Sequence, residues 1–423
     1  MDIKLIDNLV WQAVFSSPED KKKAYLKIFS LALDYGAVPA SINSFYFARG
    51  KGQLPLDFTV PAINLRGMTY DMAKCIFKLA VAKNIGALIF EIARSEIGYT
   101  DQSPQEYVAV VLAGALVENF KGPVFIQGDH YQIKVSDKAG VAKEGEVEKV
   151  KQLIKESVDA GFYNIDLDLS TLVDYSKKTV DQQQQTNYQL SADLTKYIRG
   201  LEPKGITISL GGEIGHIGGK NSNEAELRAY MDGYLNLLND KYIGLSKISI
   251  QTGTHHGGVP LADGTLADVD VDFATLKSLA KVAREYGMGG TVQHGASTLP
   301  DEYFSQFPSS EAVEVHLATG FQNIIMDHPK FPQDLLQKMY HWIDKDLLEE
   351  KKESQTDEQF HYKLRKKAWG QFKKQCWSLD EKIKQPIRTD LINRFEFMFN
   401  QLNVNNTKEM INKFIKLVKV NKN

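Results

Sequence analysis

The chain has 423 residues, of which 51 are basic and 53 acidic, so its formal net charge at pH 7 is only -2. This balance gives no general attraction for nucleic acid or for an anionic membrane, and neither is expected as a partner. The two cysteines, Cys75 and Cys376, form no CxxC pair, which argues against a thiolate zinc site and a disulfide framework. Neither a signal peptide nor a run of about 18 apolar residues is found, so we expect no membrane span and a cytoplasmic location.

The predicted elements fall into three parts along the chain. Residues 1–55 are expected to form one or two helices and then a connection that contains Gly and Pro. The middle of the chain alternates short apolar runs with segments of helix length, among them 68–84 and 143–160, whose apolar residues recur every three or four positions. The apolar runs are 58–64, 87–93, 123–129, 163–169, 206–213, 247–253, 290–295 and 321–327. Residues 331–423 are rich in Lys, Gln and Asn and are expected to be helical.

Eight strands separated by helices are typical of an α/β protein with a closed (β/α)8 TIM barrel. The alternative is a doubly wound open sheet, which also alternates strands and helices. We favour the barrel because no G-x-G-x-x-G follows the first strand. The predicted domains are an N-terminal helical extension (1–55), a barrel with the functional site (56–330) and a C-terminal helical extension (331–423).

Polar residues stand where several predicted strands end, which is where barrel enzymes place their chemistry. The third strand ends in GDH, the sixth in GTHHGG and the seventh in QHGAS. The residues at the strand ends are Asp129 and His130 (third strand), Asp166 and Asp168 (fourth), Glu213 and His216 (fifth), His255 and His256 (sixth), His294 (seventh), and Asn323, Asp327 and His328 (eighth).

Imidazoles that converge with carboxylates between them predict a site for a divalent cation. Three protein ligands would leave one coordination position open for substrate. Any single histidine in this set is more often a core or surface residue than a ligand, but their shared position beside glycines favours a metal. A metal ion at this position could catalyse hydrolysis, isomerisation or the cleavage of a carbon–carbon bond. The composition and the spacing of the residues do not indicate which of these reactions takes place.

The ordered motifs GDH, LDLS, GEIGHIGG, GTHHGG and QHGAS resemble those of the class II, zinc-dependent fructose- and tagatose-bisphosphate aldolases. The resemblance covers roughly residues 56–328. A second likeness, to the non-catalytic-type subunit of tagatose-bisphosphate aldolase, is carried by FEIARSEIGYTDQSPQEY, QGDH and AGFYNIDLDLS. Because both later histidine motifs are retained, we place the chain nearer to the active enzymes.

The resemblance implies roles for individual residues. Its three metal ligands correspond to His130, His256 and His294, with His256 preferred to His255 because it precedes Gly257 in the HG pair. Glu213 corresponds to an acidic residue near the metal.

Asp168 corresponds to a carboxylate that orients a ligand or provides an alternate metal site. Asp129 corresponds to the catalytic aspartate that moves the hydroxyl proton of the aldol step; the alternative is that it orients a ligand histidine. The implied substrate-binding residues are Asn64, Gly257, Gly295, Ser297 and Asn323.

The implied enzyme is a carbon–carbon lyase of carbohydrate metabolism, of the kind found in glycolysis, and a homodimer or larger homo-oligomer. Its cofactor would be Zn2+, or another divalent cation such as Co2+ or Mn2+. It would cleave a ketose (bis)phosphate reversibly by retro-aldol chemistry, through an enediolate whose negative charge the cation stabilises.

The sequence departs from the family pattern in three places. Asn221 stands where the family has a loop glutamate, although Glu224 or Glu226 lies nearby. No lysine follows the HG pair of the sixth strand, and Asn323 and Asp327 cannot both fit the N-x-D pattern of the eighth. Basic candidates for phosphate binding are Arg66, Arg94 and Lys220. These departures leave two alternatives open, a metal-dependent sugar epimerase or isomerase and a non-catalytic aldolase partner subunit.

Overall fold

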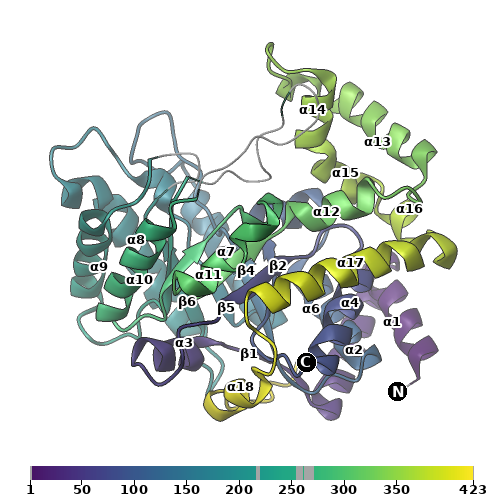
Figure 1. Cartoon of the computed structure of the whole chain (residues 1–423), viewed down its shortest axis with the longest axis horizontal. Coiled ribbons are helices and arrows are strands. Elements are labelled where there is room, and N and C mark those ends of the chain that lie inside the picture. The colour runs from purple at the N-terminus through teal and green to yellow at the C-terminus, as the bar shows by residue number, and fades with distance from the viewer. Residues whose placement is uncertain (1, 216–219, 254–260, 262–270, 423) are drawn as a thin grey trace.

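The computed structural model describes residues 2–422 except 216–219, 254–260 and 262–270. Its centre is a closed barrel of eight parallel strands (Figure 1). The ring runs β4-β3-β2-β9-β8-β7-β6-β5, and β5 closes it by pairing with β4. The strands are β2 (Val60–Asn64), β3 (Ile89–Ala93), β4 (Gly122–Asp129), β5 (Asn164–Asp166), β6 (Ser209–Glu213), β7 (Lys247–Ile250), β8 (Thr291–Gln293) and β9 (Glu314–Leu317). The predicted (β/α)8 fold is confirmed.

The eighth strand lies elsewhere than predicted. Residues 321–327 belong mostly to helix α12 (Thr319–Met326), and the strand is β9, seven residues earlier in the chain. Phe321 and Ile325 are buried four residues apart, which is helical spacing, and the apolar run was mistaken for a strand. Strand β9 escaped notice because its alternate residues Glu314 and His316 are polar and lie in the polar interior of the barrel.

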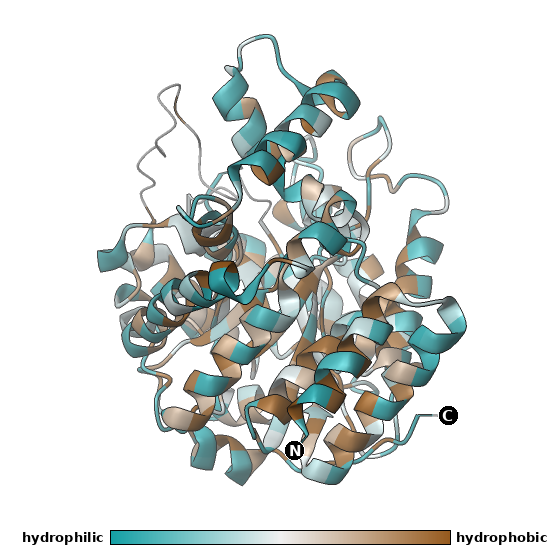
Figure 2. Cartoon of the chain, turned by 90° about the vertical axis from the view of Figure 1, so that its right-hand side faces the viewer, coloured by the Kyte–Doolittle hydropathy of each residue, from teal (hydrophilic) through white to brown (hydrophobic). Residues whose placement is uncertain are grey.

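Helices surround the barrel and turn their apolar faces towards it, as the brown inner and teal outer faces in Figure 2 show. Helix α4 (Thr69–Ala82) and helix α7 (Glu146–Ala160) confirm the helices predicted at 68–84 and 143–160. The other large helices of the barrel are α6 (Pro104–Val117), α8 (Val180–Leu201), α9 (Glu224–Leu238) and α10 (Phe273–Glu285). Two short helices, α5 (Arg94–Tyr99) and α11 (Gln306–Ser309), follow β3 and precede β9.

The N-terminal segment packs on the outside of the barrel. Helices α1 (Ile3–Phe15) and α2 (Pro18–Tyr35) contact α6, and strand β1 (Ala37–Ala40) pairs with the start of β4; helix α3 (Asn43–Gly50) follows. Both α2 and α6 begin with Ser-Pro. The Ser17 and Ser103 hydroxyls accept hydrogen bonds from the amides of Asp20 and Glu106, and proline suits the first helical turn.

The C-terminal segment folds back over the barrel. It contains α13 (Gln333–Asp346), α14 (Asp357–Leu364), the 3-10 turn η5 (Arg365–Lys367), α15 (Ala368–Gln371), α16 (Lys373–Trp377), α17 (Glu381–Gln401) and α18 (Lys408–Phe414). Helix α17 packs against α4 and α12, and α15 against α5 (Figure 1). We keep the divisions at residues 55 and 330 as proposed domain boundaries.

Two tryptophans fix this segment beside the loops that leave the barrel strands. Trp369 donates a hydrogen bond to Gln322 over 3.0 Å, and Trp377 donates to the carbonyl oxygen of Gly67 over 2.7 Å. Gly67 has φ +73°, and a Cβ there would meet the Trp369 ring at 2.2 Å. The close approach of ring and backbone therefore requires glycine.

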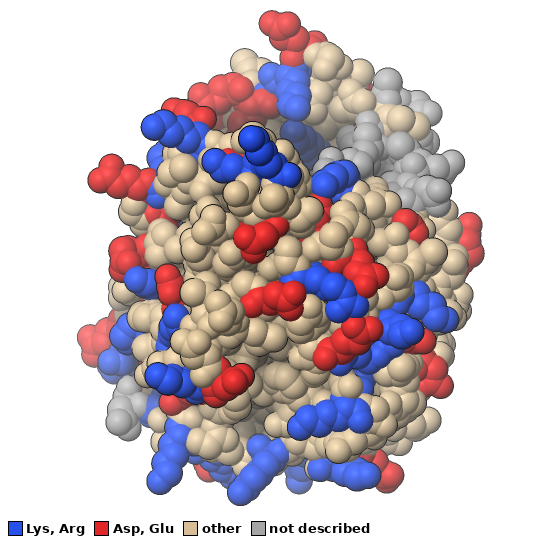
Figure 3. All heavy atoms as spheres, turned by 90° about the vertical axis from the view of Figure 1, so that its left-hand side faces the viewer, with Lys and Arg blue, Asp and Glu red and all other residues tan. Residues whose placement is uncertain are grey.

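The outer surface carries no single-sign field on the face shown in Figure 3, where basic and acidic side chains are interspersed. None of the described helices is long and apolar enough to cross a membrane.

Candidate active site

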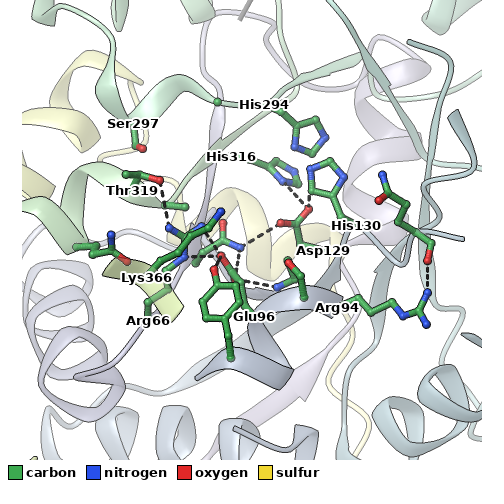
Figure 4. A pocket seen from close by; sticks show the side chains of 18 of the residues that line it. Arg66, Arg94, Glu96, Asp129, His130, His294, Ser297, His316, Thr319 and Lys366 are labelled. Carbon is green, nitrogen blue, oxygen red and sulfur yellow. Dashed lines mark hydrogen bonds and ion pairs between the residues drawn. The ribbon is translucent and has the colours of Figure 1, made fainter. Parts of the chain in front are cut away.

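A cavity of about 930 Å³ opens at the carboxyl ends of the barrel strands (Figure 4). Its size suits a small ligand such as an open-chain sugar. Barrel residues line one side, and Lys352, Tyr362, Lys363 and Lys366 of the C-terminal segment line another.

Asp129, His130 and His294 form the centre of this cavity. One carboxylate oxygen and one ring nitrogen from each histidine all lie within 4.8 Å of one another. The two rings are tilted by 34° to each other, with centroids 4.2 Å apart. Asp129 is the last residue of β4, and His130 follows it with φ +44°, a left-handed turn that redirects the chain and places both side chains in the cavity.

Two carboxylates, those of Asp168 and Glu213, contact the edge of the His130 ring that carries Nδ1. Its Nδ1 lies 3.1 Å from Asp168 Oδ2 and 3.4 Å from Glu213 Oε2, whereas its Nε2 lies 3.8 Å from Asp129 Oδ1. A proton on Nδ1 that is donated to Asp168 places the acceptor lone pair on Nε2, on the side of Asp129.

The charges around His130 are strongly coupled. Burial alone would lower the pKa of His130, but Asp129 and Glu213 hold it well above the usual value. Burial and the neighbouring Asp168 raise the pKa of Glu213 to about 8, although His130 opposes the rise. Burial would also raise the pKa of Asp168, but its hydrogen bond with His130 and that residue's charge lower it. The carboxylates around His130 stabilise its protonated, cationic form. The same negative charge would also stabilise a bound metal cation.

Asp129 is held as an ionised carboxylate. Asn64 donates to its Oδ2 over 3.1 Å, and His316 Nδ1 lies 3.3 Å from its Oδ1. Burial would raise the pKa of Asp129, but the charges of His130 and His316 keep it well below the usual value.

His316 and the charged network beneath it were not predicted from the sequence. Nε2 of His316 lies 2.7 Å from Glu314 Oε1, and its Nδ1 lies 3.3 Å from Glu91 Oε1 as well as from Asp129. Glu314 also contacts the fully buried Lys247 over 2.5 Å. The signal that could have revealed β9 is the alternation in EVHL, which places Glu314 and His316 on one face of a strand.

The predicted substrate-binding residues fall into three groups. Asn64, Gly295 and Ser297 line the cavity. Asn323 lies on α12 instead of at a strand end, is hydrogen-bonded to Tyr362 and Arg365, and does not line the cavity. Its placement at the end of a strand was wrong, for the reason given above for 321–327. The predicted metal ligand His256 and the predicted substrate-binding residue Gly257 lie outside the described residues.

The other residues of the predicted eighth strand also lie away from the histidine cluster. Asp327 forms an ion pair with Arg365, and the His328 ring lies 3.5 Å from Asp390.

The acidic residues next to Asn221 are engaged elsewhere. Glu226 accepts a hydrogen bond from the Asn223 amide in a capping box that begins α9, and it pairs with Lys220 over 2.6 Å. Glu224 pairs with Arg228 on the surface. Neither glutamate is among the described residues that line the cavity.

Comparison with protein families decides the relationship, because the family model for fructose-bisphosphate aldolase class-II matches residues 56–374. The chain belongs to this family. The family resemblance carried by the strand-end motifs is thereby confirmed, and class II aldolases depend on a metal. Comparison with curated protein sequences finds no match.

Solved structures share the fold at low sequence identity. A fructose-bisphosphate aldolase from Campylobacter jejuni is 16% identical with a TM-score of 0.50, covering 87% of this chain and 97% of its own. The fructuronate-tagaturonate epimerase UxaE from Cohnella laeviribosi is 12% identical with a TM-score of 0.52, covering 94% and 86%. A protein named "probable tagatose 6 phosphate kinase" from Sinorhizobium meliloti 1021 is 13% identical with a TM-score of 0.53, covering 84% and 93%. At these identities the likeness shows the fold alone.

Proposed function

We propose that this chain is a metal-dependent aldolase that cleaves a ketose phosphate reversibly by retro-aldol chemistry. The observation that supports it most strongly is the cluster of Asp129, His130 and His294 at the barrel mouth of a class II aldolase family member. The substrate is a ketose phosphate or bisphosphate.

The described residues suit a divalent cation. His130 and His294 offer imidazole nitrogens, the ligands that zinc, cobalt and manganese accept, and Asp168 fixes the orientation of the His130 ring. We propose His256 as the third ligand, by its position in the HG pair. A bound cation would supply a Lewis acid at the substrate carbonyl and stabilise the negative charge of the enediolate.

Asp129 is the group that takes the hydroxyl proton when the carbon–carbon bond breaks. Its carboxylate is ionised, lies beside both histidines and is held by Asn64 and His316. A general base must be unprotonated and fixed in place, and these contacts keep the Asp129 carboxylate in that state at the cavity wall. In the reverse direction the same carboxyl group returns the proton to the new hydroxyl group.

A metal-dependent sugar epimerase is the second candidate. It is favoured by Glu213, a buried carboxyl group whose Oε2 lies 3.9 Å from His294 Nε2 and whose pKa is raised by burial and by Asp168, so that it can carry a proton to or from the substrate. The enediolate must gain a proton at carbon in both reactions. Asn221, which stands where the family has its loop glutamate, donates to Asp272 instead, so this proton would pass through Glu213 in either reaction. An epimerase would use the same site without breaking a carbon–carbon bond.

The test is an assay for triose release from ketose 1-phosphates and ketose bisphosphates, with product sugars resolved by chromatography. We expect triose in stoichiometric amounts, and a loss of this activity in Asp129→Ala. Formation of a stereoisomer without any triose would contradict the aldolase and support the epimerase. Failure of the purified chain to turn over any of these sugars would contradict both and leave the partner-subunit interpretation.

A further inference from the structure

The C-terminal segment contributes an ammonium group to the cavity wall. Lys366, in the 3-10 turn η5, lines the cavity and is partly buried. In the described part of the chain no carboxylate forms an ion pair with it, and its ammonium lies 5.9 Å from the centre of the Tyr99 ring. Burial, and then the charge of Arg66, lower the pKa of Lys366 to about 8. A cation kept in such a place without a carboxylate partner is costly unless an anion joins it.

Arg66 supplies a second and rigid cation beside it. Its Nε and Nη2 both lie 2.5 Å from Glu96 Oε1, and its Nη1 donates to the Thr319 hydroxyl over 3.1 Å. Glu96 is itself fixed by Asn64 and by the amide of Ala93. The guanidinium is therefore held in one position at the cavity wall.

Two hydroxyl groups, those of Ser297 and Thr319, complete this wall. Ser297 follows β8, and Thr319 begins α12 after β9; these are the seventh and eighth strands of the ring. The Ser297 hydroxyl accepts a hydrogen bond from the Gly320 amide over 3.1 Å, which joins the two loops. Barrel proteins often bind a phosphate group between the loops after strands seven and eight and the start of a short helix.

Figure 4 shows how these groups are arranged. Ser297, Thr319, Arg66 and Lys366 lie together on one side of Asp129, and the three histidines lie on the other. All of them line one cavity. A ligand bound at the histidines can therefore extend towards the basic side without leaving the cavity.

We infer that Lys366, supplied by the C-terminal segment, is a specificity-determining residue that binds the charged end group of the substrate beside Arg66, Ser297 and Thr319. The inference rests on the proposed function for its substrate class, an open-chain ketose whose end group is a phosphate ester; a carboxylate end group is the alternative that the second experiment below distinguishes. Lys366 takes the place of the lysine that the chain lacks after the HG pair of the sixth barrel strand. It sets specificity and holds the substrate, while Asp129 acts on the hydroxyl group.

The first experiment measures anion binding without turnover, by calorimetric titration of the metal-loaded protein with sulfate. Lys366→Gln should weaken sulfate binding roughly 10- to 100-fold, because a charge-assisted contact is lost. Lys366→Arg should retain most of the binding. The matched control is Lys367→Gln, in the neighbouring residue, which pairs with Glu350 over 2.7 Å and does not line the cavity. Equal sulfate affinity in wild type and Lys366→Gln, or equal losses in Lys366→Gln and Lys367→Gln, would overturn the inference.

The second experiment measures KM and kcat for three classes of sugar, a ketose 1-phosphate, a ketohexuronate and an uncharged ketose. Lys366→Gln should raise KM for one of the two anionic sugars and leave the uncharged ketose unchanged. The sugar whose KM rises identifies the end group as phosphate or carboxylate. An equal rise for all three would mean that Lys366 only supports the fold, and would overturn the inference.

The two experiments separate this inference from the proposed function. Sulfate binding that depends on Lys366, without any triose release, would support the role of Lys366 and overturn the aldolase. Triose release together with sulfate binding that does not depend on Lys366 would support the aldolase and overturn the role of Lys366.

Discussion

Lys247→Met tests the charged network in the barrel interior. The Lys247 side chain is fully buried, and its ammonium lies 2.7 Å from Gln127 Oε1, 2.9 Å from Asp166 Oδ1 and 2.5 Å from Glu314 Oε1. Methionine nearly preserves the volume but removes the charge, so the cost comes from the carboxylates left behind.

The magnitude follows from burial. Removing one partner of a buried ion pair leaves an uncompensated charge and costs about 3–5 kcal/mol of unfolding free energy. Asp166, whose pKa burial raises to about 6 even with Lys247 present, can offset part of this by taking up a proton. Without Lys247 the folded-state pKa of Asp166 rises further above the unfolded value. The folded state then binds more protons, and the variant loses more stability as the pH rises from 5 to 8.

The assay is urea unfolding of the metal-free protein at pH 8 and at pH 5, with Lys23→Met as the matched control. Lys23 forms an ion pair with Glu19 in which the two side chains are 67% and 80% exposed, and such a pair contributes less than about 1 kcal/mol. If Lys247→Met lost no more stability than Lys23→Met at pH 8, the reasoning about the interior network would be wrong.

Four further predictions concern the cavity. His294→Ala should lose the bound metal and the activity while its circular dichroism stays that of the folded barrel; full metal content would exclude His294 as a ligand. Asp129→Ala should keep its metal and lose turnover by about 10²–10⁴-fold, as removal of a general base does, and undiminished kcat would assign the proton to another group. His316→Gln should lower kcat with little change in KM or metal content, because the ring positions Asp129; a change in KM alone would contradict this role. Sulfate binding by the wild type should weaken between pH 7 and pH 9, because Lys366 loses its proton near pH 8, whereas Lys366→Gln should show no such step; the same pH dependence in both would refute the assignment.

The barrel could be predicted because most of its strands are apolar runs between amphipathic helices, such as 143–160, which is now α7. The eighth strand could not, because the polar interior requires Glu314 and His316 on the inner face of β9 and leaves no continuous apolar run. The apolar residues of α12 were then mistaken for the missing strand, because they form a short apolar run in the sequence. The periodicity of apolar residues identified most helices and strands, but it did not predict that charged side chains fill the barrel interior.

Some of the residues that line the cavity could also be predicted from the sequence, and others could not. Asp129, His130 and His294 stand at strand ends, where topology brings distant residues together, and their meeting could be anticipated from the sequence. Lys366 could not, because its neighbours form a charged segment typical of an exposed helix. Long-range contacts hold that segment at the cavity, among them the packing of Trp369 against Gly67 and Gln322 and the ion pair of Arg365 with Asp327, and they are not visible in the local sequence.

Metal-dependent cleavage is tested most directly by measuring metal content and triose release together, on protein before and after chelation and again after zinc is restored. We predict about one divalent ion per chain and triose release that disappears with the metal and returns with it. Triose release that persists in fully metal-free protein, or a chain that binds no metal at all, would contradict it.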